Sequence, residues 1–190
     1  MEHIKEALTF DDILLVPRYS SVLPSETNLH IDLGGNLKLK IPFLSSAMDT
    51  VTESDMAISI AKKGGLGVIH RNLSIIDQLK EIKKVKNKNL IVAAAVGTTN
   101  EDLLRTKSVL DAGADLIVVD TAHGHSKKVI KILSKIKKIR SKIPICIGNI
   151  ATGDAALRLY NEGANILKVG IGPGSICTTR MVAGIGVPQI

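Results

Sequence analysis

The stretch that decides the fold is Leu116-Ile117-Val118-Val119-Asp120, four consecutive aliphatic residues followed by an acidic one. Aliphatic side chains in unbroken succession, without polar residues between them, are typical of a β-strand that is buried on both faces. Such strands occur in parallel sheets covered by helices, so the stretch indicates an α/β protein. Asp120 then lies where the strand leaves the core, at the carboxyl end of the sheet.

Apolar runs of this kind recur along the chain, with helical patterns between them. Their starts are 22 to 29 residues apart, which matches one strand together with the helix that follows it. The runs are 41–48, 65–70, 90–97, 114–121, 143–149 and 165–172. This regular period predicts six successive βα units.

The segments between the runs have the spacing and end signals of amphipathic helices. Apolar residues recur at helical spacing between the lysines of 75–85 and 129–139. Capping boxes, in which a hydroxyl and a carboxylate satisfy first-turn backbone donors, are expected at Ser74–Asp77 and Thr99–Asp102.

Glycines stand where helix C-caps belong, at Gly64, Gly113 and Gly163. The phrases around the last two, residues 111–115 and 161–165, are alike and lie 50 residues apart. That interval is about two βα units, as expected of a repeating (β/α) barrel.

The sheet could also be doubly wound, but no Gly-x-Gly-x-x-Gly motif follows the first strand. Polar residues or glycines end almost every strand, and function spread over many strand ends is the barrel pattern. We therefore predict a (β/α)8 TIM barrel, of which this chain supplies about six βα units. Residues 1–40 form an N-terminal segment and 41–190 the six units, so the barrel should not close by itself.

Composition sets the class of protein and of partner. The 190 residues are 45% hydrophobic and only 2% aromatic, which suits a core of aliphatic side chains. The net charge of +7 comes largely from helix lysines, which we interpret as solvated faces that attract anionic small ligands. A nucleic-acid patch is the weaker alternative, because no aromatic residues interleave the lysines.

Cysteine usage and hydropathy bear on the compartment. The two cysteines, Cys146 and Cys177, have neither metal-ligand nor redox spacing, so we expect a reducing cytoplasm. No apolar run reaches the roughly 18 residues that span a bilayer, and the N-terminus lacks the apolar region of a signal peptide. We expect no membrane partner.

The run Gly170-Ile171-Gly172-Pro173-Gly174-Ser175-Ile176-Cys177-Thr178-Thr179-Arg180 joins a glycine-rich loop to a cysteine. Such a loop exposes its amides and carbonyls to a phosphate or an ion. Oriented amides or a nearby cation favour a thiolate, so Cys177 is a candidate nucleophile, and an incidental small residue is the alternative. Cys146 stands in an aliphatic strand and is expected in the core.

Two polar residues at strand ends are further candidates. The carboxylate of Asp120 can accept hydrogen bonds from sugar hydroxyls, although the N-cap of the next helix is an equally good role on spacing alone. Asn149 follows Gly148 at a strand end, where its amide can orient a polar ligand or form a turn.

Several of these motifs, in this order, resemble the inosine-5'-monophosphate (IMP) dehydrogenase family. The matching segments are 8–17 (LTFDDILLVP), 45–53 (SSAMDTVTE), 70–75 (HRNLSI), 94–97 (AAVG), 120–126 (DTAHGHS) and the loop 170–180. Because several motifs in the right order are more specific than any one, the chain is identified as a member of that family. The resemblance covers practically the whole chain.

The resemblance implies a (β/α)8 barrel and a cytoplasmic oxidoreductase. The family oxidises IMP to XMP with NAD⁺, activated by K⁺, as the committed step of guanine nucleotide synthesis. Cys177 would attack purine C2 to form a covalent thioimidate intermediate, which water then releases as XMP. Covalent capture divides one difficult oxidation into two easier steps.

The resemblance also implies roles for individual residues. The implied substrate-binding residues are Ser46, Met48, Asn149, Ser175 and Thr179. The implied cofactor-binding residues are Asp120, Thr121, Ala122, Gly170, Ile171 and Gly172. The implied K⁺ ligands are the backbone carbonyls of Gly172, Gly174 and Cys177.

The chain departs from the family pattern in two places. Family members usually insert a regulatory CBS pair between the second helix and the third strand. Here residues 82–90 connect that helix directly to that strand, so we expect the CBS domains to be absent. The chain ends at Ile190, before the family's phosphate-binding strands and its mobile flap. We therefore expect this polypeptide to be inactive alone, with a second chain or a further segment completing the barrel within a homotetramer.

Two other functions remain open. GMP reductase, which converts GMP to IMP with NADPH, shares the cysteine loop, the barrel and the lack of CBS domains. Residues 46–48, 70–74 and 122–125 resemble the dehydrogenase more closely. A non-catalytic half-barrel that binds nucleotides or RNA through its lysines is the other alternative, and it predicts salt-sensitive binding.

Overall fold

The structure is a computed structural model that describes residues 6–174 and 176–190. At its centre lies a parallel sheet of six strands. The strands are β3 (Leu44–Ser45), β4 (Leu66–Ile69), β5 (Ala93–Val96), β6 (Leu116–Asp120), β7 (Ile145–Ile150) and β8 (Ile166–Val169). Each begins within one of the six predicted runs, and only β7 extends past its run, by the single residue Ile150.

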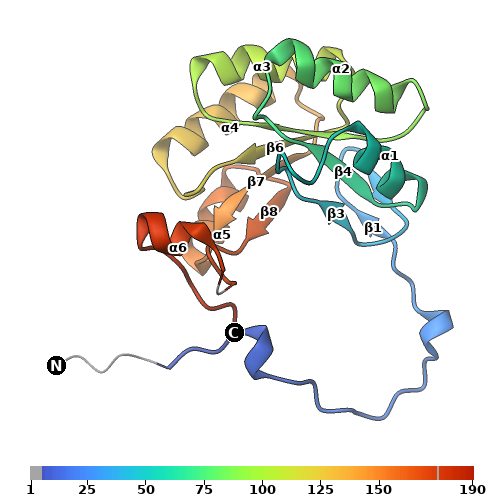
Figure 1. The fold of residues 1–190 in the computed structure, drawn as a ribbon, viewed down its shortest axis with the longest axis vertical. Helices are drawn as coiled ribbons and strands as arrows, with labels where there is room; N and C mark the ends of the chain where they lie inside the picture. The colour runs from blue at the N-terminus through green and yellow to red at the C-terminus, as the bar shows by residue number, and fades with distance from the viewer. Residues whose placement is uncertain (1–5, 175) are drawn as a thin grey trace.

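The strand order in the sheet is the order in the chain, β3 to β8, with no reversal. A doubly wound sheet would reverse direction at a switch point, whereas a barrel adds its strands in sequence. Helices connect the strands along the outer side of the curved sheet (Figure 1). The chain is thus an α/β protein that forms six strands of a TIM-type barrel, as predicted.

The helices occupy the expected segments. They are α1 (Ser54–Lys62), α2 (Ile75–Lys86), α3 (Asn100–Asp111), α4 (Lys127–Ile139), α5 (Gly153–Asn161) and a short α6 (Thr178–Ala183). None in the described part of the chain has the length and hydropathy needed to cross a bilayer.

Strand residues alternate between two cores. On β6, Ile117 and Val119 pack in the cluster that the sheet shares with the outer helices, together with Leu133 and Ile136 of α4. Leu116 and Val118 pack in a second cluster on the inner side of the curve, which we call the lumen. Because Asp120 follows this alternation, its carboxylate lies on the lumen side, at the carboxyl rim.

A small antiparallel hairpin closes the amino-terminal end of the lumen. It consists of β1 (Ile31–Asp32) and β2 (Lys38–Leu39), and both Leu37 and Leu39 join the lumen cluster. Before it, the described N-terminal segment contains only the short 3-10 helices η1 (Phe10–Asp12) and η2 (Pro24–Glu26). This segment passes outside the sheet and meets the C-terminal end, where Ile190 N donates to Leu8 O at 3.1 Å (Figure 1).

The helix-end signals are mostly confirmed. Thr99 and Asp102 form the complete capping box of α3. Ser74 caps α2 by accepting from Asp77 N at 3.1 Å. The Asp77 carboxylate, however, accepts from the Ser74 hydroxyl at 2.7 Å instead of from the Ser74 backbone N–H, so this capping box is incomplete. The three predicted C-cap glycines follow α1, α3 and α5 with left-handed φ angles of 92°, 99° and 89°.

The apolar pattern of α2 is only partly a buried stripe. Ile82 and Val85 are fully buried, but Ile76 is 67% exposed. Two polar residues, Gln78 and Glu81, take buried positions on this helix instead. Each has specific hydrogen-bond partners there, which hydropathy alone does not reveal.

Candidate active site

The carboxyl ends of the strands surround a cavity of about 630 Å³, which we call the rim cavity. Residues from five strand ends line it, although they are far apart in the sequence. The predicted site residues among them are Ser46, Met48, Asp120, Thr121, Ala122, Asn149, Gly170, Ile171, Gly172, Cys177 and Thr179. Gly174 is the one predicted residue in the described part that does not line the cavity, and Ser175 lies outside the described residues.

The glycine-rich loop is held at its start by hydrogen bonds from the sheet. Gly170 N donates to Ile150 O at 2.8 Å, and Asn149 Nδ2 donates to Gly170 O at 2.8 Å. The Asn149 amide thus orients the loop, so its role is more than a local turn. Val187 N donates to Ile171 O at 2.8 Å, which brings the C-terminal residues alongside.

Cys177 is partly exposed at the N-cap position of α6. Hydrogen bonds from the side chain and backbone of Thr179, and the backbone and charge of Arg180, lower the pKa of the thiol. These groups stabilise the thiolate, which is the nucleophilic form. By contrast, burial raises the pKa of Cys146 to about 12, and this cysteine packs in the lumen as predicted.

Asp120 forms an ion pair that the sequence did not suggest. Lys168 Nζ of β8 lies 2.9 Å from Asp120 Oδ1 of β6, across the intervening strand β7. Gly148 of β7 makes room for this crossing, because a Cβ there would lie 2.5 Å from Lys168 Cβ. The N-cap alternative for Asp120 does not hold, since Ser126 caps α4.

A second rim cavity of about 340 Å³ adjoins the first, and Met48, Arg71 and Asp120 line both. Its wall is polar, and Asn72 Nδ2 donates to Asp49 Oδ2 there at 2.9 Å. His70 also lines it; this residue is only 2% exposed, and its Nε2 lies 3.3 Å from Glu53 Oε1. Arg71 and Lys168 are site residues that we did not single out from the sequence. Arg71 directly follows the predicted strand 65–70, and that position is the signal that could have found it. Lys168 is a lysine inside the aliphatic run 165–172, and its position at a strand end was not apparent from the sequence.

Comparison with known proteins agrees with this geometry. The family model described as "IMP dehydrogenase / GMP reductase domain" matches residues 7–190. The chain belongs to this family. The match includes both the strand ends and the cysteine loop that surround the rim cavity.

Individual relatives within the IMP dehydrogenase / GMP reductase family are similar over nearly the whole chain. The inosine-5'-monophosphate dehydrogenase of Borreliella burgdorferi is 46% identical, with 98% of this chain and 58% of that protein covered. The enzyme of the same name from Cryptosporidium parvum is 43% identical, with coverage of 100% and 57%. That from Staphylococcus haemolyticus is 31% identical, with coverage of 98% and 64%. The chain therefore spans about three fifths of the length of these relatives.

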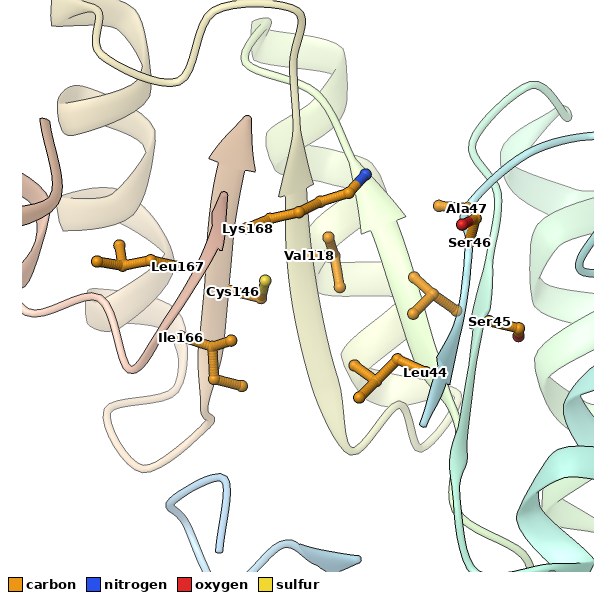
Figure 2. Close-up of a pocket in the computed structure, with 10 residues that line it drawn as sticks. Leu44, Ser45, Ser46, Ala47, Val118, Cys146, Ile166, Leu167 and Lys168 are labelled. Atoms are coloured by element: carbon orange, nitrogen blue, oxygen red, sulfur yellow. The ribbon is translucent and has the colours of Figure 1, made fainter. Parts of the chain in front are cut away.

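The lumen of this family member is open to one side. A mainly apolar pocket of about 280 Å³ lies between β3 and β8, the two edge strands of the sheet. Figure 2 shows Val118, Cys146 and Ile166 around it, with Lys168 extending across its upper end. Since the lumen of a barrel is normally filled by side chains from all its strands, this pocket is unfilled core and not a ligand site.

The predicted potassium ligands are engaged by protein donors. Arg180 donates through Nε to Gly172 O and through Nη2 to Pro173 O, the latter at 3.2 Å. Gly174 O accepts from Cys177 N, and Cys177 O accepts from Arg180 N. A cation at Gly172 O would lie beside the guanidinium, so this arrangement does not fit one. Potassium binding stays a prediction.

Proposed function

We propose that this chain carries the nucleophile and most of the cofactor site of an enzyme that oxidises IMP to XMP with NAD⁺. The observation that supports this most directly is Cys177, a partly exposed thiol with a lowered pKa on the wall of the rim cavity. A reactive thiol at a cavity needs a substrate with an electron-poor carbon. The purine C2 of IMP, the substrate in the names of the relatives, is such a carbon.

The proposed chemistry begins when the Cys177 thiolate forms a bond to C2 of the purine. Bound NAD⁺ supplies the hydride acceptor for the hydrogen on that carbon. Water then adds to C2 and the carbon–sulfur bond breaks, which releases XMP and returns the thiolate, with one proton passing to solvent. Thr179 stabilises the thiolate before attack and after release, because its hydrogen bonds favour the charged sulfur.

The residues around the cavity suggest where each nucleotide binds. Asp120 would accept from ribose hydroxyls of the cofactor, with Thr121, Ala122 and the backbone of 170–172 beside it. Lys168 is already paired with Asp120, so a ribose would share the carboxylate with the ammonium. Ser46, Met48, Asn149 and Thr179 remain for IMP. The proposed contact of Ser175 with IMP concerns a residue outside the described part.

We also propose that two further βα units complete the barrel. Edge strands β3 and β8 have no partner on their outer sides within the described sheet, and Val169 on β8 is 56% exposed. Both observations suit strands that pair with more of the barrel. We call this chain together with the segment that supplies those units the completed enzyme.

A homotetramer is our proposal for the assembly. Leu14, Leu15 and Val16 of the N-terminal segment are each at least 80% exposed, and consecutive exposed aliphatic side chains are typical of an interface. Light scattering of the completed enzyme should give four times the protomer mass. A monomer at micromolar concentration would contradict the tetramer without affecting the proposed chemistry.

The activity is tested by giving the completed enzyme IMP with NAD⁺, and separately GMP with NADPH, while the absorbance of the reduced cofactor is followed. We expect turnover of IMP only. Cys177→Ala should abolish turnover and the covalent adduct seen by mass spectrometry, whereas Cys146→Ala, the matched control, should retain both. Turnover of GMP alone would assign the chain to GMP reductase. Salt-sensitive RNA binding that is indifferent to Cys177→Ala would favour the non-catalytic alternative.

A further inference from the structure

A buried glutamine on α2 binds the ends of two neighbouring strands. Gln78 is fully buried, and its Nε2 lies 2.9 Å from Ala95 O, 3.1 Å from His70 O and 3.4 Å from Ile69 O. These carbonyls are at the carboxyl ends of β4 and β5, where each strand turns into its rim loop. The amide thus connects two rim loops from behind.

Arg105 of α3 extends this connection. Its Nη1 donates to Gln78 Oε1 at 3.0 Å, and its Nη2 donates to Leu73 O at 3.0 Å. Arg105 is only 8% exposed, and its charge is balanced by Asp102, with Nε 3.9 Å from Oδ1. Asp102 in turn accepts from Thr99 N at 2.9 Å. The network therefore holds the β4–α2 loop at both ends and reaches the β5–α3 loop.

Packing of two helices does not explain this network. Burying a guanidinium and an amide costs free energy that aliphatic residues at the same positions would not cost. Most of the hydrogen bonds, moreover, end on backbone carbonyls of the rim rather than between the helices. Such an arrangement suits the fixing of a loop conformation, because each bond restrains the backbone directly.

The loop that is fixed in this way carries Arg71. Arg71 stands between His70, whose carbonyl binds Gln78, and Leu73, whose carbonyl binds Arg105. It lines both rim cavities together with Asp120, the candidate ribose acceptor. Within the described residues its guanidinium forms no ion pair; its charge helps to lower the pKa of Asp102, but that carboxylate is already bound by Thr99. The guanidinium can therefore still bind an anion in the rim cavities.

We propose that Gln78 and Arg105 are positioning residues that hold the 70–73 loop so that the guanidinium of Arg71 binds the phosphates of the dinucleotide cofactor. This inference rests on the proposed function, because it assumes that the cofactor occupies the rim cavity. It assigns to Arg71 a binding role and to the buried pair an indirect one.

A double-mutant cycle in the completed enzyme tests the proposal. Arg71→Ala should raise the KM for NAD⁺ about tenfold, because one charge-assisted hydrogen bond to the cofactor is lost. The KM for IMP and kcat should be nearly unchanged. Arg105→Gln should raise the same KM by a similar factor, but should add little in the Arg71→Ala background. Equal effects of Arg105→Gln in both backgrounds, or none in either, would overturn the proposal.

Two variants separate positioning from general stability. Arg140→Gln is the matched control, because Arg140 also donates to a backbone carbonyl, Leu110 O at 3.2 Å, at the end of α3 away from the rim. It should leave the KM for NAD⁺ unchanged. Arg105→Lys keeps the charge beside Asp102 but lacks the fork that reaches both acceptors, so it should fold and still show the raised KM. Full rescue by lysine would contradict the proposed geometry.

Hydrogen exchange provides a readout that does not depend on activity. In Arg105→Lys the amides of 70–73 should exchange about tenfold faster than in the unaltered chain, while those of central strand β6 stay unchanged. If exchange accelerates but the completed enzyme oxidises no IMP, the proposed function fails and the positioning of the loop stands. If IMP is oxidised and loop exchange is unchanged, the positioning role fails alone.

Discussion

At the scale of single residues, two cysteines of the same chain have opposite properties. Hydrogen bonds from Thr179, together with the charge of Arg180, lower the pKa of Cys177. Burial in the lumen raises the pKa of Cys146 to about 12. The difference arises because the thiolate is stabilised at one site and desolvated at the other.

Selective alkylation is the expected consequence. At neutral pH, iodoacetamide should modify Cys177 and leave Cys146 intact, since only the thiolate reacts. Thr179→Val removes the side-chain hydrogen bond, so the pKa of Cys177 should rise and its alkylation at neutral pH should slow several-fold. At pH values above the ordinary thiol pKa, Cys177 should be alkylated at similar rates in the variant and in the original chain. Peptide mass spectrometry over a pH series measures both, and preferential labelling of Cys146 would contradict the assignment.

Asp120 is expected to affect cofactor binding through its carboxylate. In the completed enzyme, Asp120→Asn should raise the KM for NAD⁺ about tenfold, because an amide is a weaker acceptor for hydroxyls and no longer balances Lys168. Asp115→Asn is the matched control, since Asp115 pairs with Lys86 at 2.9 Å on the amino-terminal side of the sheet. Steady-state kinetics of both variants would reveal the difference, and equal KM values would exclude Asp120 from the cofactor site.

At the scale of elements, polar residues of one helix hold the end of another. Glu81 of α2 accepts from Ser54 N, in the first turn of α1, at 2.8 Å, and is also paired with Lys84. Burial acts to raise the pKa of Glu81, but the hydrogen bonds from Lys84 and Ser54 outweigh it, so the pKa is lowered. The carboxylate thus caps a neighbouring helix through a tertiary contact.

Glu81→Gln should therefore reduce the free energy of unfolding by about 1 kcal/mol at neutral pH. Because the folded-state pKa is lowered, the stabilisation is present above the unfolded-state pKa and is lost as the pH falls through the folded-state value. The variant and the original chain should consequently become equally stable in acid. Urea unfolding at several pH values tests this, with the more exposed Glu162→Gln as the control expected to change stability by less than about 0.5 kcal/mol.

At the scale of the whole molecule, the curved sheet is open between its two edge strands. Six strands bring the rim residues together, yet the lumen stays open between β3 and β8. The hairpin residues Leu37 and Leu39 seal only the amino-terminal end. The rim residues therefore have strands of the described sheet on one side of the site, and none on the side between β3 and β8.

Completion of the barrel should protect its edges. In the chain alone, amides of β3 and β8 should exchange within seconds to minutes, and in the completed enzyme at least tenfold more slowly, because edge hydrogen bonds open by local fraying. Amides of β6, which already has neighbours on both sides, serve as the internal control. Hydrogen exchange with mass spectrometry measures this, and unchanged edge strands would show that the additional segment pairs elsewhere.

The sequence alone was sufficient for much of the fold. Aliphatic runs such as Leu116–Val119 predict buried strands because their side chains must leave water on both faces of a sheet. Capping residues such as Thr99 act within one turn, so their effect is also readable locally. The cysteine loop was found for the same reason, since its glycines and Cys177 are neighbours in the chain.

The tertiary structure decided which distant polar groups meet. Lys168 pairs with Asp120 across 48 residues, and Arg105 binds Gln78 across 27, distances at which no local spacing rule applies. On α2, Gln78 is buried although it is polar, because backbone carbonyls of other elements, such as Ala95 O, accept hydrogen bonds from its amide. Ile76 of the same helix is exposed although it is apolar. Hydropathy along the helix alone indicates neither outcome. By itself the sequence determined the six βα units and located the glycine-rich cysteine loop, through local hydropathy and backbone chemistry. Only the curved sheet, by bringing strand ends together, decided the partners of the charged groups at the rim.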